Sequence, residues 1–321
     1  MAIITKDIFS AKRILDAGEL VAIPTETVYG LAANGTDPLA LQKIFEAKGR
    51  PVNNPLILHF CHLNAIAPYV GELPEVAKLL ASAFWPGPLT LLLPKSNKVP
   101  EIVTAGNNRV AVRVPDHSLT LHLLEQLGYP LAAPSANPSG YISPTQPTHV
   151  QQQLGKKIPM ILDGGPCQSG IESTILGWDE DSIPIIYRPG AITAEEISIA
   201  LGVTPQIKKE NTVLLAPGMS SSHYAPKTPT IATTSIREEL ERNRGKKIGL
   251  ITLTSGYEDN DSITEQCILS PQGSLEEMGR KLYAAMYELD HMDLDVIVIE
   301  FTTGQGLGKA INDRLKRSST Q

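Results

Sequence analysis

The sequence predicts an α/β protein with two domains, and three observations lead to this prediction. Up to about residue 200 the spacing of apolar residues switches repeatedly between helix and strand periods. After that point the pattern fades into a stretch rich in Pro, Ser and Gly, and beyond this stretch strand and helix patterns return. We therefore expect a larger domain at 1–202, an extended linker at 203–229 and a smaller α/β domain at 230–321, a division that suits a chain of 321 residues.

The elements of the first domain follow one another closely. Apolar residues at 8–15 share one helical face, which ends at Gly18. Asp37 followed by Pro38 is a typical helix start, and this helix is predicted to end near Gly49. Apolar runs of strand length lie at 20–24, 55–60, 89–93, 109–114, 130–133, 159–163 and 184–188.

The second domain shows the same alternation on a smaller scale. The run KKIGLITLT has the composition of a strand, and so has DVIVIEF near the end of the chain. Between them, apolar residues from Leu275 to Leu289 form a helical stripe. A strand, a helix and a further strand predict a small α/β unit.

Composition narrows the class of protein. Hydrophobic residues make up 42% and charged residues 19%, as in soluble folded proteins, and no apolar run is long enough to cross a membrane. The N-terminus has neither an uninterrupted apolar segment nor a small-residue cleavage site, so we expect a cytoplasmic protein. A formal net charge of −6 argues against attraction of nucleic acid to the whole surface, so any site for a polyanion has to be local.

Polar clusters follow several of the predicted strands. In PTETVYG a strand ends at a proline, and Thr25, Glu26 and Thr27 could orient a small polar ligand, although a capped turn explains them equally well. In KGRPVNNPL two cations, Lys48 and Arg50, precede a pair of amides, Asn53 and Asn54. Such a set suits phosphate oxygens, while the alternative is that the cations complement the end of a helix.

Charged residues also lie inside predicted strands. His59 stands in PLILHF on the face shared by Ile57, where a lone histidine is more often a core residue than a ligand. Arg109 and Arg113 are four residues apart on one strand and therefore share a face. Because buried arginine needs an anion, they require carboxylate partners or an anionic ligand, and we favour the ligand.

The later clusters are rich in hydrogen-bond donors. APSANPSG places Ser135 and Asn137 in a tight turn that suits phosphate or ribose, or that is simply an Asx turn. GIESTI contributes a Glu-Ser-Thr corner, and YRPG places Arg188 at a strand end. Donors are many and acids few.

This inventory favours one type of chemistry over others. The chain has no G-x-x-x-x-G-K-[ST] phosphate loop, no HExxH zinc motif and no Ser-His-Asp order. Phosphoryl or nucleotidyl transfer depends mainly on positioning and charge neutralisation, which many donors and cations provide.

The motifs as a set resemble the YrdC-like family of threonylcarbamoyl-AMP synthases. The resemblance runs, in order, through PTETVYGLAAN, KGRPVNNPLILHF, WPGPLTLLL, VAVRVPDH, APSANPSG, GIESTI and YRPGAIT. The segments APGMSSSHYAPKTP and GLGKAINDRLKR resemble the long two-domain members. The implied fold is α/β: a twisted open mixed sheet around a large concave basic cavity, joined by a linker to a smaller Rossmann-like C-terminal domain.

The resemblance also implies a reaction. Members condense L-threonine, bicarbonate and ATP, with Mg²⁺, into L-threonylcarbamoyl-AMP and release pyrophosphate. A separate tRNA threonylcarbamoyl transferase complex then uses the product to modify the adenosine beside the anticodon. The partners expected for this chain are therefore the three substrates and that complex, with RNA contact as a further possibility and no membrane.

Site residues are implied position by position. L-Threonine would be held by Thr27, His59, Arg113, the backbone at Ala133, and Ser173. ATP would be held by Arg50, Asn54, Arg109, Ser135, Ser143, Arg188 and Tyr224. The catalytic set would be Lys48, Arg50, Ser135 and Asn137, with no metal-ligating residue assigned. Because Tyr224 lies in the linker, the linker is expected to act as a lid over the active site.

Three other interpretations remain open at this point. A basic cavity could bind double-stranded RNA or a tRNA end without catalysis, which predicts affinity that falls steeply with salt. The chain could instead be a carbamoyltransferase domain like those of hydrogenase maturation, although the acylphosphatase and zinc-finger segments of those proteins are missing here. The second domain could also be purely structural.

Overall fold

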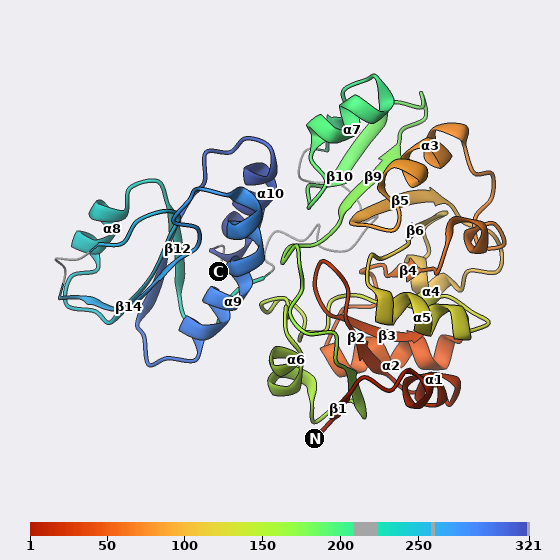
Figure 1. Cartoon of the computed structure of the whole chain (residues 1–321), viewed down its shortest axis with the longest axis horizontal. Coiled ribbons are helices and arrows are strands. Elements are labelled where there is room, and N and C mark those ends of the chain that lie inside the picture. The colour runs from red at the N-terminus through yellow and green to blue at the C-terminus, as the bar shows by residue number, and fades with distance from the viewer. Residues whose placement is uncertain (209–223, 258–260, 320–321) are drawn as a thin grey trace.

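The structure is a computed structural model that describes residues 1–208, 224–257 and 261–319. It contains two β-sheets, each covered by helices, which lie side by side (Figure 1). Most of the expected linker, and with it most of the expected lid, falls on 209–223 and so lies outside the described residues.

The first sheet is open and mixed, as predicted, and has eleven strands within the described residues. In spatial order they are β1 (Ile3–Thr5), β8 (Met160–Leu162), β2 (Val21–Ile23), β3 (Gly30–Asn34), β7 (Leu131–Ala132), β4 (Ile57–His59), β6 (Arg109–Arg113), β5 (Leu89–Pro94), β9 (Thr174–Trp178), β10 (Pro184–Arg188) and β11 (Gln206–Ile207). For example, β4 runs parallel to β6, whereas β5 runs antiparallel to it. Strand β11 pairs with β10, so this sheet extends beyond Gly202 into the segment expected as linker.

Helix α2 (Pro38–Lys48) shows how local sequence sets the ends of an element. The Asp37 side chain accepts a hydrogen bond from the Leu39 amide, Pro38 occupies the first turn, and Gly49 closes the helix at a φ of 60°. The start and the end are those predicted. The other helices of this domain are α1 (Ile8–Asp16), the 3₁₀ helix η1 (Leu63–Ile66), α3 (Glu75–Phe84), α4 (Glu101–Thr104), α5 (Ser118–Gln126), α6 (Pro147–Leu154) and α7 (Ala194–Leu201).

Strand β4 separates the core from a pocket. Leu58 packs in the main hydrophobic core with Leu41 and Ile44 of α2. Ile57 and His59 point to the opposite face and line the pocket. This alternation confirms that His59 shares the face of Ile57, as the strand period predicts.

The second sheet has four strands in the described residues, all parallel, as a small α/β domain of Rossmann-like type requires. They are, in spatial order, β12 (Thr230–Thr233), β15 (Val296–Glu300), β13 (Ile248–Thr252) and β14 (Ile263–Ile268). Its helices are α8 (Ile236–Arg242), α9 (Leu275–Asp290) and α10 (Leu307–Ser318). The predicted stripe on α9 is buried at Met278, Leu282, Met286 and Leu289.

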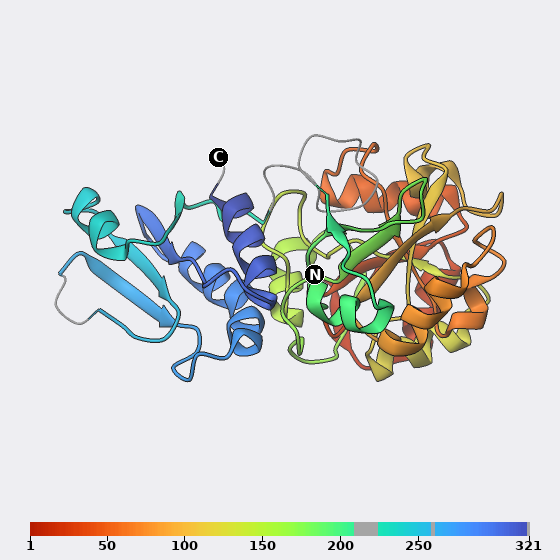
Figure 2. The same ribbon diagram turned by 90° about the horizontal axis from the view of Figure 1, so that it is seen from above.

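Helices α9 and α10 lie between the small sheet and the first domain, whereas α8 packs on the other face of that sheet (Figure 2). Val28 and Ile142 of the first domain belong to the same apolar cluster as α9 and α10. His149 of α6 stacks on Tyr287 of α9, with ring centroids 4.2 Å apart. The two domains therefore share a packed contact. Among the described residues, we find no helix with both the length and the apolar character needed to span a membrane.

Candidate functional site

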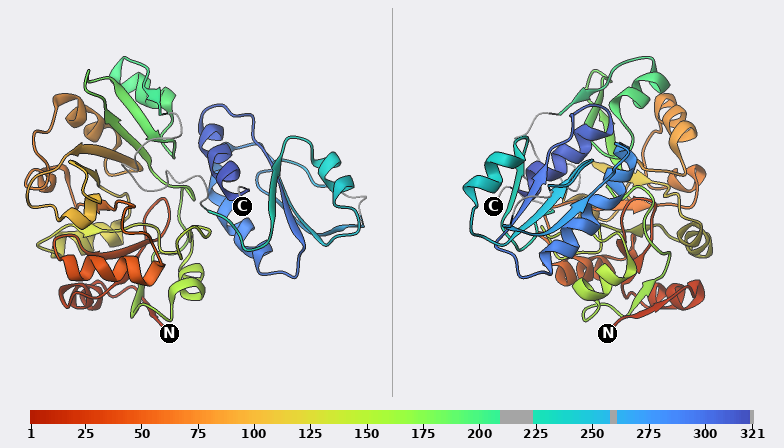
Figure 3. Two further views of the ribbon diagram at one scale, coloured as in Figure 1. Left: turned by 180° about the vertical axis from the view of Figure 1, so that it is seen from behind. Right: turned by 60° about the vertical axis from the view of Figure 1, so that its left-hand side comes forward.

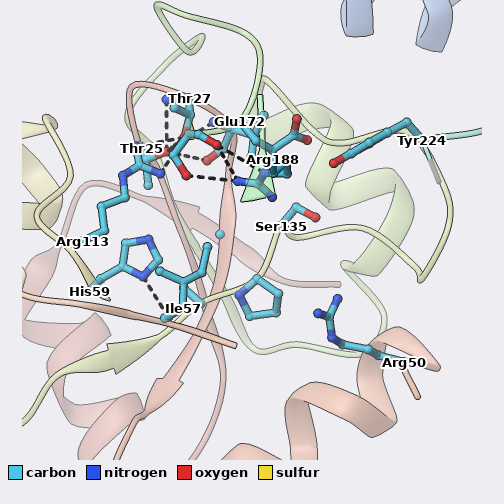
Figure 4. Close-up of a pocket in the computed structure, with 15 residues that line it drawn as sticks. Thr25, Thr27, Arg50, Ile57, His59, Arg113, Ser135, Glu172, Arg188 and Tyr224 are labelled. Atoms are coloured by element: carbon cyan, nitrogen blue, oxygen red, sulfur yellow. Dashed lines mark hydrogen bonds between the residues drawn. The ribbon is translucent and has the colours of Figure 1, made fainter. Parts of the chain in front are cut away.

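A pocket in the first domain gathers side chains that are far apart in the sequence (Figure 4). It encloses about 520 Å³ of space, part of it open to solvent. Its walls are built largely from strand ends and the loops beside them, where α/β proteins commonly place their sites. The lining residues are Thr25, Thr27, Val28, Gly30, Arg50, Ile57, His59, Arg113, Ala133, Pro134, Ser135, Glu172, Ser173, Arg188 and Tyr224.

The pocket contains most of the residues expected to bind substrate. All five positions expected for L-threonine line it, and so do Arg50, Ser135, Arg188 and Tyr224 from the set expected for ATP. In Figure 4, His59 and Arg113 lie on one side of the pocket and Arg50 and Tyr224 on the other. The sequence motifs therefore converge on one cavity.

Arg113, at the end of β6, is buried and tightly held. Its Nε donates to the Gly87 carbonyl at 3.2 Å, and both Nη atoms donate to Thr27 Oγ1 at 3.1 Å. Its Nη2 also lies 2.6 Å from Glu26 Oε1, which makes a buried ion pair. Thr27 and Arg113 are thus brought together, as expected from the motifs.

Glu26 belongs to the PTETVYG cluster noted in the sequence, but the family resemblance assigned it no role in binding or catalysis. It is 4% exposed, and apart from the ion pair its carboxylate oxygens accept no hydrogen bond within the part of the chain that the structure describes. Its position between Thr25 and Thr27 was the available sequence signal. Because the oxygens of this buried carboxylate can still accept hydrogen bonds, the Glu26–Arg113 pair is a contact that a bound substrate could change.

His59 is held in the neutral form. Burial, and after it the charge of Arg113, lower the pKa of His59 to about 3. Its Nδ1 lies 3.2 Å from the Ile57 carbonyl. At neutral pH the ring therefore adds a polar but uncharged surface to the pocket wall.

Ser173 connects the two sides of the pocket. Arg188 donates to the Ser173 carbonyl from Nε at 3.2 Å and from Nη2 at 2.8 Å, and Nη2 also lies 3.1 Å from Ser173 Oγ. The same hydroxyl is 2.8 Å from Thr90 Oγ1 on β5, a partner that the sequence did not reveal. The Ser173 hydroxyl is therefore fixed from two directions.

Arg50 reaches the pocket from the end of α2. Its Nε donates to the Asn54 carbonyl at 3.1 Å, and its Nη2 donates to Asn54 Oδ1 at 2.5 Å and to the Pro55 carbonyl at 2.8 Å. Burial lowers the pKa of Arg50 to about 10, which still leaves it charged at neutral pH. Asn54 does not line the pocket and instead orients Arg50.

Lys48 and Asn137 support the loop that carries Ser135. The Lys48 ammonium donates to the carbonyls of Ser135, at 2.6 Å, and Asn137. The Asn137 amide donates to the carbonyls of Pro138 and Tyr141, both at 2.8 Å. Neither side chain is among those that line the pocket. Both expected catalytic residues thus act in this structure by shaping the Ser135 turn.

Ser143 acts through Glu172. Its hydroxyl donates to Glu172 Oε1 at 2.7 Å, and it is Glu172 that lines the pocket. The other partners of Glu172 come from the second domain: Tyr283 of α9 and Arg314 of α10. Arg314 lies in the GLGKAINDRLKR segment that resembles the two-domain members, but the sequence assigned it no role, and Tyr283 lies in none of the motifs.

Tyr224 is the first described residue after the gap at 209–223. Its side chain is buried and lines the pocket, and its ring lies 5.7 Å from that of Tyr283. The next residue, Ala225, donates its amide to the Gly140 carbonyl at 2.8 Å. The end of the linker is thereby fastened to the loop that follows Ser135.

Comparisons with known proteins agree with the motifs. A family model covering the Sua5, YciO and YrdC proteins, described as "Telomere recombination", matches residues 13–190, and the model of the threonylcarbamoyl-AMP synthase C-terminal domain matches residues 192–320. The threonylcarbamoyl-AMP synthase of Pyrococcus abyssi is 42% identical over 94% of this chain and 91% of its own length. The chain belongs to the threonylcarbamoyl-AMP synthase family.

Two further relatives extend over both domains. The threonylcarbamoyl-AMP synthase of Bacillus subtilis is 40% identical over 97% of this chain and 92% of its own length. The crystal structure of Pyrococcus abyssi Sua5 complexed with L-threonine superposes with a TM-score of 0.91 at 40% identity, covering 99% of this chain and 97% of that one. The chain is thus of the two-domain type within the threonylcarbamoyl-AMP synthase family.

One residue expected at the ATP site of this synthase family lies elsewhere. Arg109, at the start of β6, donates to the Trp178 carbonyl and lines a separate depression with Asp179 and Tyr187. It shares a sheet face with Arg113, as predicted, but stands at the opposite end of the strand. A common strand face does not by itself bring two side chains to one pocket.

Proposed function

We propose that the chain condenses L-threonine, bicarbonate and ATP into L-threonylcarbamoyl-AMP and releases pyrophosphate. The observation that carries this proposal is the convergence of Arg50, Arg113, Arg188, Ser135 and Ser173 on one pocket in a member of the synthase family. Cations and hydroxyls in one cavity match a reaction between an amino acid and a triphosphate.

L-Threonine would occupy the side of the pocket near His59. Arg113 would pair with its carboxylate, while Thr27, Ser173 and the backbone at Ala133 would contact its other polar groups. Support comes from the position of these residues in the pocket and from the structural match to a relative solved with L-threonine. Neutral His59 would contact the ligand without adding a second cation.

ATP would occupy the side near Tyr224. Arg50 and Arg188 are buried cations with forked donors suited to phosphate oxygens, and Ser135 offers a hydroxyl at the turn held by Lys48. Asn54, Asn137 and Ser143 would contribute by fixing these groups, as their hydrogen bonds indicate. Confinement of both substrates in one pocket would supply much of the rate enhancement.

The chemistry requires orientation more than a protein nucleophile. The deprotonated amine of L-threonine captures bicarbonate as a carbamate with loss of water. A carbamate oxygen then attacks the α-phosphorus of ATP, and the bond from that phosphorus to the bridging oxygen of pyrophosphate breaks. Arg50 and Arg188 would stabilise the charge that gathers on the leaving group.

Mg²⁺ would enter with ATP as part of the substrate. Among the described residues there is no group of three or more His, Cys, Asp and Glu side chains placed to hold a metal ion. Glu172 is engaged by Arg314 and Ser143, and Glu26 by Arg113. This donor set fits an ion held largely by phosphate oxygens, the usual mode of Mg²⁺ in ATP-using enzymes, and it would neutralise charge on the triphosphate there.

The product would serve tRNA modification in the cytoplasm. We propose that a separate tRNA threonylcarbamoyl transferase complex consumes the adenylate. Direct contact with double-stranded RNA stays a prediction, and the net charge of −6 would confine it to a local surface.

Pyrophosphate release by the purified protein tests the proposal. L-Threonine and bicarbonate are omitted in turn, with Mg²⁺ and ATP present, and the nucleotide product is identified by mass spectrometry. We expect release to require both substrates and to yield the mass of threonylcarbamoyl-AMP, and Arg50→Ala to abolish most of it. Pyrophosphate release that does not depend on L-threonine would contradict the proposed reaction. Full release by Arg50→Ala would contradict the proposed site.

A further inference from the structure

The second domain lies beside the first (Figure 3), and its helix α9 packs directly against the loop that carries Gly170. A Cβ placed on Gly170 would lie 2.4 Å from Arg280 Cα and 2.5 Å from the Gly279 carbonyl oxygen, both on α9. The loop therefore touches the helix backbone with no space for a methyl group. Two residues after Gly170, the same loop presents Glu172 and then Ser173 to the pocket.

Arg314 of α10 extends this contact into the site. Its side chain is fully buried, and each nitrogen of the guanidinium has an acceptor: Nε donates to Glu172 Oε2 at 2.8 Å, Nη1 to Asp313 Oδ2 at 2.6 Å, and Nη2 to the Pro189 carbonyl at 2.9 Å. The guanidinium carbon also lies 5.2 Å from the ring centroid of Tyr224. One side chain of the second domain thus contacts three segments that form the pocket wall.

Glu172 is the partner of Arg314 that places a negative charge in the pocket wall. It lines the pocket beside Ser173 and accepts from Ser143 at 2.7 Å, from Tyr283 at 3.1 Å and from Arg314. Burial alone would raise the pKa of Glu172, but the charges of Arg314 and Arg188 and these hydrogen bonds lower it to about 2. The group is therefore an anion in the wall of a pocket proposed to hold a triphosphate.

Without Arg314, Glu172 would keep its hydrogen bonds from Ser143 and Tyr283 but lose its directly paired cation, and its charge would then oppose nucleotide binding in two ways. It would repel phosphate groups across a medium of low dielectric constant, and it would attract Arg188 more strongly, drawing Nε and Nη2 of that residue from Ser173. A cation placed behind Glu172 prevents both effects.

We propose that Arg314 is a positioning residue by which the second domain prepares the ATP site: it neutralises the charge of Glu172 in the pocket wall, so that this carboxylate does not repel the phosphates. The inference rests on the proposed function, because it assumes that a triphosphate occupies this pocket. It assigns the second domain a part in the reaction that its fold alone does not reveal.

The same helix offers a matched control. Lys309 of α10 pairs with Glu195 of the first domain at 2.7 Å, so it also bridges the domains, but both side chains are largely exposed and do not line the pocket. If Arg314 served domain docking alone, losing either cation would leave ATP affinity unchanged. Lys309→Met therefore separates docking from charge balance.

The test is equilibrium binding of Mg²⁺ and a non-hydrolysable ATP analogue by calorimetry, with KM and kcat measured alongside. We expect Arg314→Met to weaken nucleotide binding about 30-fold, with a smaller change in KM for L-threonine, and Arg314→Lys to retain more affinity. Lys309→Met should bind within about twofold of the parent. Adding Glu172→Gln to Arg314→Met should restore most of the lost affinity, because the uncompensated anion is removed as well.

Unchanged nucleotide affinity in folded Arg314→Met, or a double variant that binds no better than Arg314→Met, would overturn the inference. If Arg314→Met fails to fold by circular dichroism, Arg314→Gln decides, because it also removes the charge but keeps a hydrogen-bond donor, and a folded Arg314→Gln that binds nucleotide like the parent would overturn the inference. Binding needs no turnover, so these outcomes are separate from the proposed reaction. That reaction is contradicted by a parent protein that binds ATP but forms no adenylate.

Discussion

Two buried glutamates border the site, and their surroundings differ. Glu26 and Glu172 each precede a hydroxyl residue of the pocket, and each pairs with an arginine. Glu172 has Ser143, Tyr283 and Arg314 as partners, drawn from both domains. Glu26 has the ion pair with Arg113 from its own domain, and its oxygens accept no hydrogen bond among the described residues.

The comparison separates a fixed carboxylate from a replaceable one. A carboxylate with several charge-assisted hydrogen bonds is part of the scaffold, because each partner loses an acceptor if it moves. A carboxylate held by one ion pair can give way to another anion of similar geometry. We infer that Glu172 stays in place through the reaction, whereas Glu26 occupies the place on Arg113 that the carboxylate of L-threonine would take.

The largest expected effect is on stability, from Glu172→Gln. Because Glu172 titrates at about 2 instead of its ordinary 4.5, its carboxylate stabilises the fold above about pH 4.5, and this contribution disappears as the pH falls toward 2. We expect Glu172→Gln to lower the free energy of unfolding by about 3 kcal/mol near neutral pH. The difference from the parent should shrink in acid, as urea titrations at several pH values would show.

Glu26→Gln is the matched control for that measurement, since both glutamates are buried to a similar degree. We expect Glu26→Gln to lower the free energy of unfolding by less than half as much as Glu172→Gln does. Equal losses at neutral pH, or a Glu172→Gln difference that does not change with pH, would contradict the distinction between the two carboxylates.

The second prediction concerns Arg113 itself. Arg113→Met removes the cation proposed to bind the substrate carboxylate, so we expect KM for L-threonine to rise about 30-fold or more. Affinity for ATP, measured without L-threonine, should change far less because the nucleotide is placed on the other side of the pocket. Steady-state kinetics with L-threonine varied give its KM, and calorimetry with Mg²⁺ and a non-hydrolysable ATP analogue gives the nucleotide affinity.

Parallel weakening of both substrates would argue against separate sides of the pocket. Arg113→Lys sharpens the result, since it keeps the charge but loses the forked donors that now bond Thr27 and Gly87. It should recover part of the affinity for L-threonine.

The sequence located the first-domain half of the site because its residues lie in short motifs at strand ends. The helix end at Gly49 was predicted, but the effect of its αL turn on the two flanking cations was not. The turn separates Lys48, which binds the Ser135 carbonyl, from Arg50, which lines the pocket. The K-x-R spacing alone makes the two cations look equivalent. Tertiary placement assigns them different tasks.

Two features could not be predicted from the local sequence pattern: the second-domain half of the site and strand β3 of the first domain. Arg314 is 142 residues from Glu172 and sits in a helix rich in charged residues, where an unburied arginine is the ordinary expectation. Strand β3, of sequence GLAAN, has small residues with weak strand preference, and its pairing with β2 and β7 decides its conformation. In both cases residues outside the local segment determine the outcome.

A smaller effect is expected from Glu26→Gln on binding. In the free protein Arg113 would lose its anionic partner, so binding of a substrate carboxylate would no longer have to displace one. We expect the Kd for L-threonine to fall about fivefold, roughly 1 kcal/mol, while nucleotide affinity is unchanged. Calorimetric titration with L-threonine measures this directly, and a rise in Kd would show that Glu26 helps to hold the ligand instead.

The smallest effect concerns Arg109, which shares its strand and face with Arg113 but contacts Trp178 outside the pocket. If the expected role of position 109 in ATP binding depends on its side chain, Arg109→Met should weaken nucleotide affinity like a loss at Arg50. From its location we expect less than about a twofold change in KM for either substrate, as for other side chains that touch no ligand. A tenfold rise in KM for ATP would place Arg109 at the nucleotide and require the pocket to extend along β6 when ATP is bound.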